Sequence, residues 1–226
     1  MQARIIFITG TDTGVGKTLL TGLLLAHLRQ TDVHALAMKP FCSGDRADVE
    51  ILHALQDGEL GRDEINPFYF SEPLAPIVAA RKRKRLVTLE EGLGCIETVA
   101  KGCDLLLVEG IGGACVPLGE DYLVADMIRG LGCETIVVSR NRLGAIHCTL
   151  STCYALARIG ISEVRIGLME QRKPDGASNT NGEILKEWLE HCALVSIPYL
   201  GRNASIPKQI NKSAKKIKKT LAKLLE

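Results

Sequence analysis

Residues 10–18 have the sequence Gly-Thr-Asp-Thr-Gly-Val-Gly-Lys-Thr and lie between two apolar segments. The preceding residues 5–8 form a continuous apolar run, which predicts a buried strand. The leucines between positions 19 and 24 have the spacing of one face of a helix. A glycine-rich turn between a strand and a helix is the usual context of a phosphate-binding loop, because free backbone amides converge there on an anion. The segment therefore predicts a P-loop NTPase-like fold.

The last residues of this loop carry the groups that a bound nucleotide requires. We expect the ammonium of Lys17 to contact the outer phosphates as a point charge. We expect the hydroxyl of Thr18 to ligate Mg²⁺. The loop departs from the standard pattern at Thr11, which occupies the position where a glycine is usual, and Gly10 comes one residue earlier.

Composition limits the class of protein. The chain has 226 residues, of which 46% are apolar, so we predict a single domain over residues 1–226. A net charge of +2 predicts no strong attraction to nucleic acid or to a membrane. No apolar run approaches the length of a membrane span, and the phosphate loop starts too early to leave room for a signal peptide. The eight cysteines contain no Cys-x-x-Cys pair, which favours reduced core residues in a cytoplasmic protein.

Further apolar runs alternate with segments of helical spacing along the chain. The runs that predict strands are residues 33–38, 104–109, 135–139, 165–169 and 194–197. This alternation predicts an α/β fold with a mostly parallel, doubly wound sheet flanked by helices. In such sheets ligands bind beyond the carboxyl ends of the strands.

Two charged residues follow or end predicted strands at that edge. Lys39 follows the strand of residues 33–38, and Pro40 keeps it extended by disfavouring helix at the preceding residue. Glu109 ends the strand of residues 104–109 and precedes Gly110-Ile111-Gly112-Gly113. A carboxylate beside a phosphate loop is suited to Mg²⁺, which takes oxygen ligands and shares them with phosphates. The alternatives are a solvated lysine and a structural carboxylate.

Three other segments have simpler interpretations. Residues 63–85 contain three X-Pro pairs and predict a loop. Its five basic residues, 81–85, lack interleaved aromatics, which favours a solvated turn over a nucleic-acid site. Thr88 and Glu91 have the spacing of a capping box, so a helix should follow them. The tail from residue 210 has helical apolar spacing among lysines and should pack on the domain rather than on a membrane.

Several segments, in this order along the chain, together resemble dethiobiotin synthetase. They extend from residue 10 to about residue 200 and are the phosphate loop, Met38-Lys39-Pro40 with Ser43-Gly44, Asp48, Val108-Glu109-Gly110-Ile111-Gly112-Gly113, and Leu143-Gly144-Ala145-Ile146. Asn66-Pro67 and the run from Glu72 to Pro76 are similar to the substrate-side loop of that family.

The resemblance implies a role for each matching position. Thr18, Asp48 and Glu109 would hold Mg²⁺, and Lys39 and Lys17 would act in catalysis. The ATP-binding set would be Thr13, Gly14, Val15, Gly16, Lys17, Thr18, Asp48, Glu109, Gly110, Ile111, Gly112, Gln171, Pro198, Tyr199 and Leu200. The substrate-binding set would be Ser43, Leu143, Gly144, Ala145 and Ile146.

The resemblance also implies a reaction and an assembly. The expected substrates are 7,8-diaminopelargonic acid, CO₂ and ATP, which would form a cyclic urea through a carbamate that ATP phosphorylates. The expected assembly is a cytoplasmic homodimer with shared active sites, which binds neither nucleic acid nor membrane. The sequence differs from the family at Gln171, where an asparagine is usual, and at His147-Cys148, where Asn-His is usual.

Two alternative functions fit the phosphate loop. One is an ATP ligase of the cobyrinate type, which usually carries a further glutamine-hydrolysing domain. The other is a nucleotide-switched ATPase of the chromosome-partition or septum-site type. Those ATPases carry a signature lysine at the position of Thr11, and this chain lacks it. Lys39-Pro40 together with Ser43 also argues against such an ATPase, and 226 residues leave no room for the glutamine-hydrolysing domain of a cobyrinate-type ligase.

Overall fold

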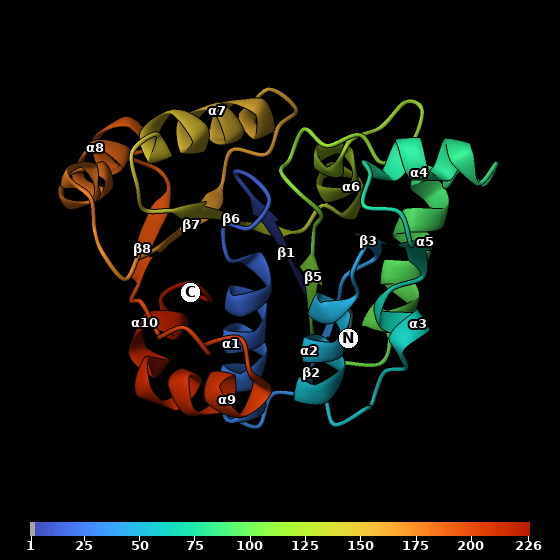
Figure 1. Cartoon of the computed structure of the whole chain (residues 1–226), viewed down its shortest axis with the longest axis horizontal. Coiled ribbons are helices and arrows are strands. Elements are labelled where there is room, and N and C mark those ends of the chain that lie inside the picture. The colour runs from blue at the N-terminus through green and yellow to red at the C-terminus, as the bar shows by residue number, and fades with distance from the viewer. Residues whose placement is uncertain (1–2) are drawn as a thin grey trace.

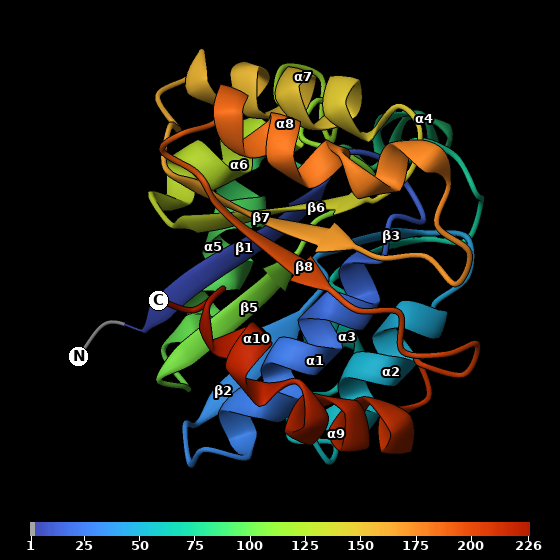
Figure 2. The same ribbon diagram turned by 90° about the vertical axis from the view of Figure 1, so that its left-hand side faces the viewer.

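A central parallel sheet lies between two layers of helices in the computed structural model, which describes residues 3–226 (Figure 1). Helices α6, α7 and α8 lie on one side of the sheet, α1 and α10 pack on the other side, and α9 packs on α1 (Figure 2). The predicted doubly wound α/β fold with a mostly parallel sheet is confirmed. Within residues 3–226, no helix combines the length and apolar character needed to cross a bilayer.

Strands and helices alternate along most of the chain. The strands are β1 (Arg4–Gly10), β2 (Ala35–Met38), β3 (Phe41–Ser43), β4 (Phe68–Phe70), β5 (Leu105–Glu109), β6 (Glu134–Arg140), β7 (Val164–Met169) and β8 (Ala193–Ile197). The helices are α1 (Lys17–Arg29), α2 (Ala47–Leu55), α3 (Arg62–Ile65), α4 (Pro76–Lys82), α5 (Leu89–Ala100), α6 (Val124–Leu131), α7 (Ala145–Ala157), α8 (Asn181–Trp188), α9 (Pro207–Lys216) and α10 (Lys218–Ala222). A short 3₁₀ turn, η1 (Gly176–Asn179), precedes α8.

The order of the strands decides which loops meet. The main sheet has the order β2-β5-β1-β6-β7-β8, and every neighbouring pair is parallel. All six strands therefore end at one edge. The loop after β1 lies beside the end of β5 on one side and the end of β6 on the other, and β2 adjoins β5. Three loops that are far apart in sequence are thus neighbours at this edge.

Burial follows from the apolar runs. β1 and β5 are buried along almost their whole length, as expected of strands covered on both faces. Leu20, Leu23 and Leu24 of α1 have no exposed surface and pack on the sheet. Burial of this kind contributes about 1.5–3 kcal/mol for each large apolar side chain. The sheet edge is consequently a rigid support for the loops.

The prediction of a loop over residues 63–85 is wrong, because this segment contains α3, β4 and α4. Residues 41–43 form β3, which pairs in parallel with β4 in a separate two-stranded sheet. The ring centroids of Phe41 and Phe68 are 4.8 Å apart, so aromatic packing holds the two short strands together. Pro76 is the first residue of α4, where its fixed φ favours a helix start.

One helical prediction differs from the structure in extent, one is confirmed and one helix was missed. α6 was not predicted, although Val124, Met127 and Ile128 form a buried face and Asp126 caps its start. The C-terminal tail packs on α1 as expected, but it is divided into α9 and α10 at Ile217. The predicted capping box of α5 is confirmed: the Glu91 amide donates to Oγ1 of Thr88 across 3.1 Å.

Candidate active site

The phosphate loop connects β1 to α1 and adopts backbone conformations that glycine favours. Gly14 has φ of +71° and Gly16 has φ of +109°, both in the left-handed region. Gly16 is the N-cap of α1, so the unpaired amides of the first helical turn are directed into the loop. The ammonium of Lys17 donates to the carbonyl of Asp12 across 2.9 Å and is almost buried. This arrangement is a cradle for an anion.

Lys39 is held at the edge of the sheet by its backbone. Its amide donates to the carbonyl of Ile65 across 2.8 Å, and its carbonyl accepts from the side-chain amide of Asn66 across 3.0 Å. Asn66 also donates to the carbonyl of Pro40 and is itself buried. The lysine is therefore anchored by residues from the segment that includes α3 and the start of β4.

The ammonium of Lys39 lies between two carboxylates. It is 2.5 Å from Oδ2 of Asp48 on α2 and 2.7 Å from Oε1 of Glu109 at the end of β5. The hydroxyl of Thr18 donates to the same Oε1 of Glu109 across 2.7 Å. Glu109 has no exposed surface, and Lys39 is 6% exposed. The structure thus brings together four residues from α1, α2, β5 and the end of β2.

Burial and neighbouring charges set the protonation of this cluster. Burial acts to lower the pKa of Lys39, but the carboxylates of Glu109 and Asp48 outweigh it and hold that pKa above its ordinary value. Burial acts to raise the pKa of Asp48, but the charge of Lys39 and its hydrogen bond lower it overall. Burial lowers the pKa of Lys17 to about 8, because it has no comparably close carboxylate. Lys39 is therefore charged at neutral pH.

The same oxygens fit the chemistry of a magnesium site. The three residues proposed as ligands contribute a hydroxyl and two carboxylates, which a hard divalent cation prefers. Oε2 of Glu109 is buried and has no hydrogen-bond partner among the described residues. A buried carboxylate oxygen without a partner is costly, and a cation would satisfy it. The donor set of Thr18, Asp48 and Glu109 is therefore compatible with Mg²⁺.

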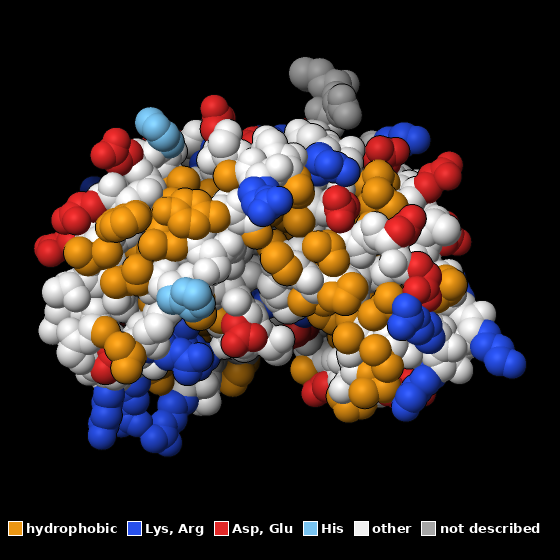
Figure 3. All heavy atoms as spheres, turned by 90° about the horizontal axis from the view of Figure 1, so that it is seen from above, with side chains coloured by type: hydrophobic (Ala, Val, Ile, Leu, Met, Phe, Trp, Pro, Cys, Tyr) orange, Lys and Arg blue, Asp and Glu red, His pale blue; other side chains and the backbone are white. Residues whose placement is uncertain are grey.

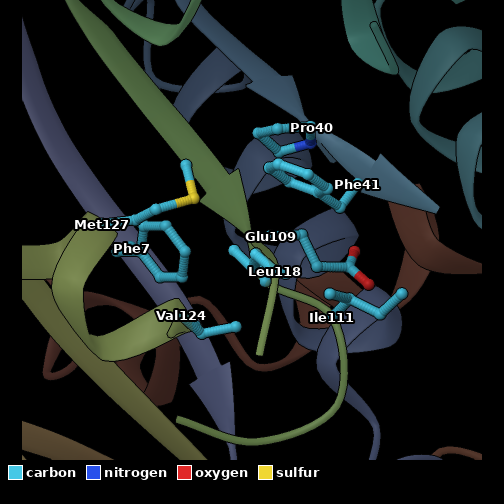
Figure 4. Close-up of a pocket in the computed structure, with 9 residues that line it drawn as sticks. Phe7, Pro40, Phe41, Glu109, Ile111, Leu118, Val124 and Met127 are labelled. Carbon is cyan, nitrogen blue, oxygen red and sulfur yellow. The ribbon is translucent and has the colours of Figure 1, made fainter. Parts of the chain in front are cut away.

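Apolar packing fixes the direction of Glu109. Phe7, Phe41 and Met127 lie behind it around a cavity of only about 10 Å³. Figure 4 shows the carboxylate directed away from Phe7 and Met127. A methyl group added at the neighbouring Gly110 would lie 2.8 Å from the ring of Phe7, so this strand end packs closely against Phe7. The carboxylate consequently points toward the cluster rather than into the core.

One large cavity joins most of the predicted phosphate-side residues to Ser43 of the predicted substrate set. It has a volume of about 820 Å³. The predicted residues that line it are Thr13, Gly14, Gly16, Lys17, Thr18, Lys39, Ser43, Asp48, Glu109, Ile111 and Gly112. The run from Pro73 to Pro76 also lines it, as expected from the similarity of that run to a substrate-side loop. Val15 and Gly110 lie in the adjoining loops without lining the cavity.

The cavity also has lining residues that sequence reasoning missed. Cys42 and Asp45 lie in and after β3, and Arg140 ends β6. Val116 and Ser205 line it from loops. The position of Arg140 at the end of a predicted strand was a signal for it, whereas Val116 and Ser205 carry no recognisable pattern in the sequence.

The remaining four residues of the predicted ATP-binding set lie after β7 and β8, outside the lining of this cavity. Gln171 follows β7, and Pro198, Tyr199 and Leu200 follow β8. The Nε2 atom of Gln171 donates to the carbonyl of Asn141 across 2.7 Å. Because that carbonyl only accepts, the orientation of the Gln171 amide is determined, and its Oε1 accepts no hydrogen bond from residues 3–226.

The predicted substrate segment 143–146 also lies outside the cavity of its own chain. Leu143 is 80% exposed, and its amide donates to Asp175 across 2.8 Å. Gly144 is the N-cap of α7 with φ of +91°. Ala145 and Ile146 form the first turn of that helix. The structure therefore does not bring this segment together with Lys39 within one chain.

Solved structures of distant proteins share this fold. The septum site-determining protein MinD from Pyrococcus horikoshii OT3 has a TM-score of 0.65 at 16% identity, covering 98% of this chain and 94% of that protein. A ParA family ATPase from Chlorobium tepidum TLS has a TM-score of 0.60 at 16% identity, covering 96% of each chain. Likeness at such low identity shows the fold alone.

Comparison by sequence identifies the family. A family model described as an AAA domain matches residues 4–206. The ATP-dependent dethiobiotin synthetase BioD of Bacillus subtilis (strain 168) is 36% identical over 206 residues, which cover 88% of this chain and 86% of that protein. The BioD protein of Bacillus licheniformis is 39% identical over 183 residues, covering 75% of this chain and 78% of that protein. The chain therefore belongs to the ATP-dependent dethiobiotin synthetase family.

Proposed function

We propose that this chain is an ATP-dependent dethiobiotin synthetase that acts on 7,8-diaminopelargonic acid and CO₂ with Mg²⁺. The observation that carries the proposal is the position of the Lys39 ammonium, between Asp48 and Glu109 in the cavity that the phosphate loop lines. That cavity extends from the phosphate loop to the run from Pro73 to Pro76, so it offers room for a nucleotide and a second substrate side by side.

The proposed reaction forms two C–N bonds and needs no side-chain nucleophile. One amine of the diamine adds to CO₂ and loses a proton, which gives a carbamate. A carbamate oxygen attacks the γ-phosphorus of ATP, so ADP leaves and a mixed anhydride forms. The second amine attacks the carbamate carbon, the ring closes, and phosphate departs with the protons balanced by solvent. The protein has to align the reactants and neutralise negative charge.

Two lysines supply most of that neutralisation. Lys17 lies within the loop that cradles the phosphates, and its pKa of about 8 leaves it mostly charged at neutral pH. Lys39 carries its charge at the meeting point of the phosphate loop and the substrate side. Preorganised charges in a protein site are worth more to a transition state than the same charges in water. Lys39 is thus suited to the carbamate and to the transferred phosphoryl group.

The magnesium ligands would be Thr18, Asp48 and Glu109. When bound, the ion would supply positive charge to the phosphate oxygens during transfer. The three side chains come from α1, α2 and β5, so the site depends on the packing of the whole sheet edge.

The nucleotide base would lie at the ends of β7 and β8. The free Oε1 of Gln171 can accept a hydrogen bond from an exocyclic amino group, as in adenine. Pro198, Tyr199 and Leu200 offer apolar surface next to it, and Tyr199 is 41% exposed. This arrangement favours ATP over GTP, because guanine presents a carbonyl at the corresponding position.

A homodimer would complete the substrate site. The first turn of α7 does not line the cavity of its own chain, so we infer that it serves the cavity of a second copy. The face that carries α7, α8 and α4 displays apolar side chains (Figure 3). Tyr154 of α7, Trp188 of α8, Val78 of α4 and Leu143, just before α7, are exposed apolar residues of these elements. A two-fold interface would place the amides at the start of α7 near the substrate carboxylate.

Product analysis tests the proposed function. The chain is incubated with the diamine, ATP, Mg²⁺ and ¹³C-bicarbonate, and the product is identified by mass spectrometry. The account predicts a cyclic urea that carries the label in its carbonyl, and it predicts far less product with Lys39→Met. Lys101→Met is the matched control, because Lys101 is an exposed lysine at the end of α5. ATP hydrolysis without any labelled ring product would reject the proposal.

The nucleotide-switched ATPase is the weaker candidate. Its solved representatives share the fold at 14–16% identity, which carries no functional argument. Thr11 occupies the position of their signature lysine. We propose instead that residues 1–226 form one cytoplasmic domain that carries out the ligase reaction together with a segment from a second copy.

A further inference from the structure

Arg140 is a charged residue beside the phosphate loop to which neither the sequence patterns nor the proposed reaction assigned a role. It ends β6, which pairs with β1 so that Val138 lies opposite Gly10. This register places the end of β6 next to the start of the phosphate loop. The side chain is exposed and lines the large cavity.

The guanidinium of Arg140 makes one specific contact with that loop. Its Nη2 donates to the carbonyl oxygen of Gly14 across 2.6 Å. No salt bridge joins Arg140 to a carboxylate within the described residues, although many arginines there, such as Arg4 and Arg165, are paired. Its other N–H groups are therefore available to an anion.

The contact has a geometric consequence for the loop. A trans peptide unit directs its carbonyl and its N–H to opposite sides. The carbonyl of Gly14 and the amide of Val15 belong to one such unit. By holding the Gly14 carbonyl, Arg140 therefore also fixes the direction of the Val15 amide. Gly14 is in the left-handed region with φ of +71°, and an added methyl group there would meet no atom within 4 Å, so packing does not restrain it. The Val15 amide has no backbone acceptor among residues 3–226.

We propose that Arg140 is a positioning residue of the nucleotide site. By holding the Gly14 carbonyl, it turns the Val15 amide toward the anion that the loop cradles, and it adds a positive charge beside that anion. The inference rests on the proposed function only in so far as the cavity binds a nucleotide. Arg140 acts through the loop and has no part in the chemistry of the carbamate.

Nucleotide affinity tests the proposal, with Arg142 as the matched control. Arg142 lies two residues further along the chain, is exposed and does not line the cavity. The variants are Arg140→Ala, Arg140→Lys and Arg142→Ala, and the Kd of ADP is measured by calorimetry on each folded protein. One charge-assisted hydrogen bond corresponds to a change of roughly tenfold or more. We expect Arg140→Ala to raise this Kd about tenfold, Arg140→Lys to restore part of the loss, and Arg142→Ala to leave it unchanged.

Kinetics separate positioning from a structural role. Arg140→Ala should raise the KM of ATP by a similar factor, with kcat within about threefold of the parent and the KM of the diamine unchanged. A lower thermal midpoint with unaltered ADP affinity would show a structural role only and overturn the proposal. Equal losses of affinity in Arg140→Ala and Arg142→Ala would show that general charge, rather than the Gly14 contact, is responsible.

A second variant keeps the test decisive if Arg140→Ala does not fold. Arg140→Gln removes the charge but keeps an N–H donor, and it should retain more nucleotide affinity than Arg140→Met. Equal affinities of these two variants and the parent would overturn the proposal. ADP binding is measured without the diamine, so a parent that binds ADP but makes no cyclic urea would reject the proposed reaction and leave the inference on Arg140 testable.

Discussion

The ammonium of Lys39 donates a hydrogen bond to Oε1 of Glu109 across 2.7 Å, and both groups are almost completely buried. The lysine thus lies among the oxygens proposed to ligate Mg²⁺. An ammonium can satisfy these carboxylates in the absence of a metal, and it remains close to them when a metal is bound. The positive charge needed for phosphoryl transfer, on Lys39, therefore lies next to Asp48 and Glu109, which would hold Mg²⁺.

Replacing Lys39 by methionine should slow turnover strongly. Loss of one well-aimed donor to a transition state typically costs about 10²–10³ in kcat. The folded variant should also bind Mn²⁺ without nucleotide more tightly than the parent, because the ammonium no longer competes for the carboxylates. Steady-state kinetics and electron paramagnetic resonance check the two effects. Turnover within about threefold of the parent would contradict the assigned role.

The same substitution should reduce stability when no metal is present. Removing one partner of a buried ion pair typically costs about 3–5 kcal/mol, because the other charge stays buried without compensation. Glu109 would be in that situation. Chemical denaturation with and without Mg²⁺ and ADP measures the effect, and the ligands should recover part of the loss. The Lys101→Met control should unfold like the parent.

Replacing the carboxylates should alter the metal requirement. Asp48→Asn and Glu109→Gln keep the shape of each side chain but remove a charge from the proposed Mg²⁺ site, so each should raise the Mg²⁺ concentration needed for half-maximal activity. Glu50→Gln is the matched control, since Glu50 is on the same helix as Asp48 and pairs with Arg62 at the surface. Identical Mg²⁺ titrations for the two site variants and the control would remove both carboxylates from the metal site.

Nucleotide binding should take up protons near pH 8. Burial lowers the pKa of Lys17 from its ordinary 10.5 to about 8, so near that pH about half of the free protein has a neutral Lys17. Phosphates favour the charged form, and binding should therefore weaken as the pH rises from 7 to 9. Calorimetry of ADP binding at pH 8 in buffers of different ionisation enthalpy should show uptake of about half a proton. Lys17→Arg stays charged, and unchanged uptake in that variant would contradict the assignment.

The lowered pKa of Lys17 also fixes the sign of its effect on folding. The unfolded chain, with Lys17 at its ordinary pKa, binds more protons than the folded chain between about pH 8 and 10.5. The contribution of this residue to the free energy of unfolding therefore increases with pH in that window. Below about pH 8, burial of the charged Lys17 lowers the free energy of unfolding, and a bound phosphate offsets this loss of stability.

Replacing Gln171 should weaken discrimination between bases. Its Oε1 is free to accept from an exocyclic amino group, whereas its Nε2 is held by Asn141. The parent should therefore prefer ATP to GTP in kcat/KM, and Gln171→Ala should reduce that preference by roughly tenfold, the value of one good hydrogen bond. CTP, which also carries an amino group, should be affected like ATP. A preference that survives the substitution undiminished would show that another residue selects the base.

Subunit exchange tests whether two chains share each site. Lys39→Ala and Gly144→Trp should each be inactive as homodimers, while a mixed dimer holds one intact site. Random pairing gives about half mixed dimers, so about a quarter of the parental activity should return. Gly160→Trp is the matched control, because Gly160 also has a positive φ and open space but follows the other end of α7. If subunits exchange and activity stays at the level of the separate variants, sites are not shared.

The fold and the centre of the site could be predicted because each depends on local pattern. The apolar run before the phosphate loop predicts a buried parallel strand. Lys39 follows a second buried strand, β2, and Glu109 ends a third, β5. Parallel strands end at one edge, so the meeting of these residues followed from the sheet alone. The capping box of Thr88 and Glu91 is likewise a local signal that the structure confirms.

Features that depend on tertiary contacts could not be predicted. β3 and β4 are three residues each, and they exist because Phe41 and Phe68 pack together. The contact of Arg140 with Gly14 joins residues far apart in the chain, and no spacing rule indicates it. The bond of Gln171 to Asn141 similarly depends on the register of β6 and β7. Geometry of this kind appears only in the folded chain.

Release of ADP tests the central claim most directly. It is measured in four mixtures that contain the chain, ATP and Mg²⁺, with and without the diamine and with and without bicarbonate in CO₂-depleted buffer. The account predicts rapid release only when both the diamine and bicarbonate are present, since phosphoryl transfer requires the carbamate as acceptor. ADP release at the same rate in all four mixtures would show a simple ATPase and contradict the account.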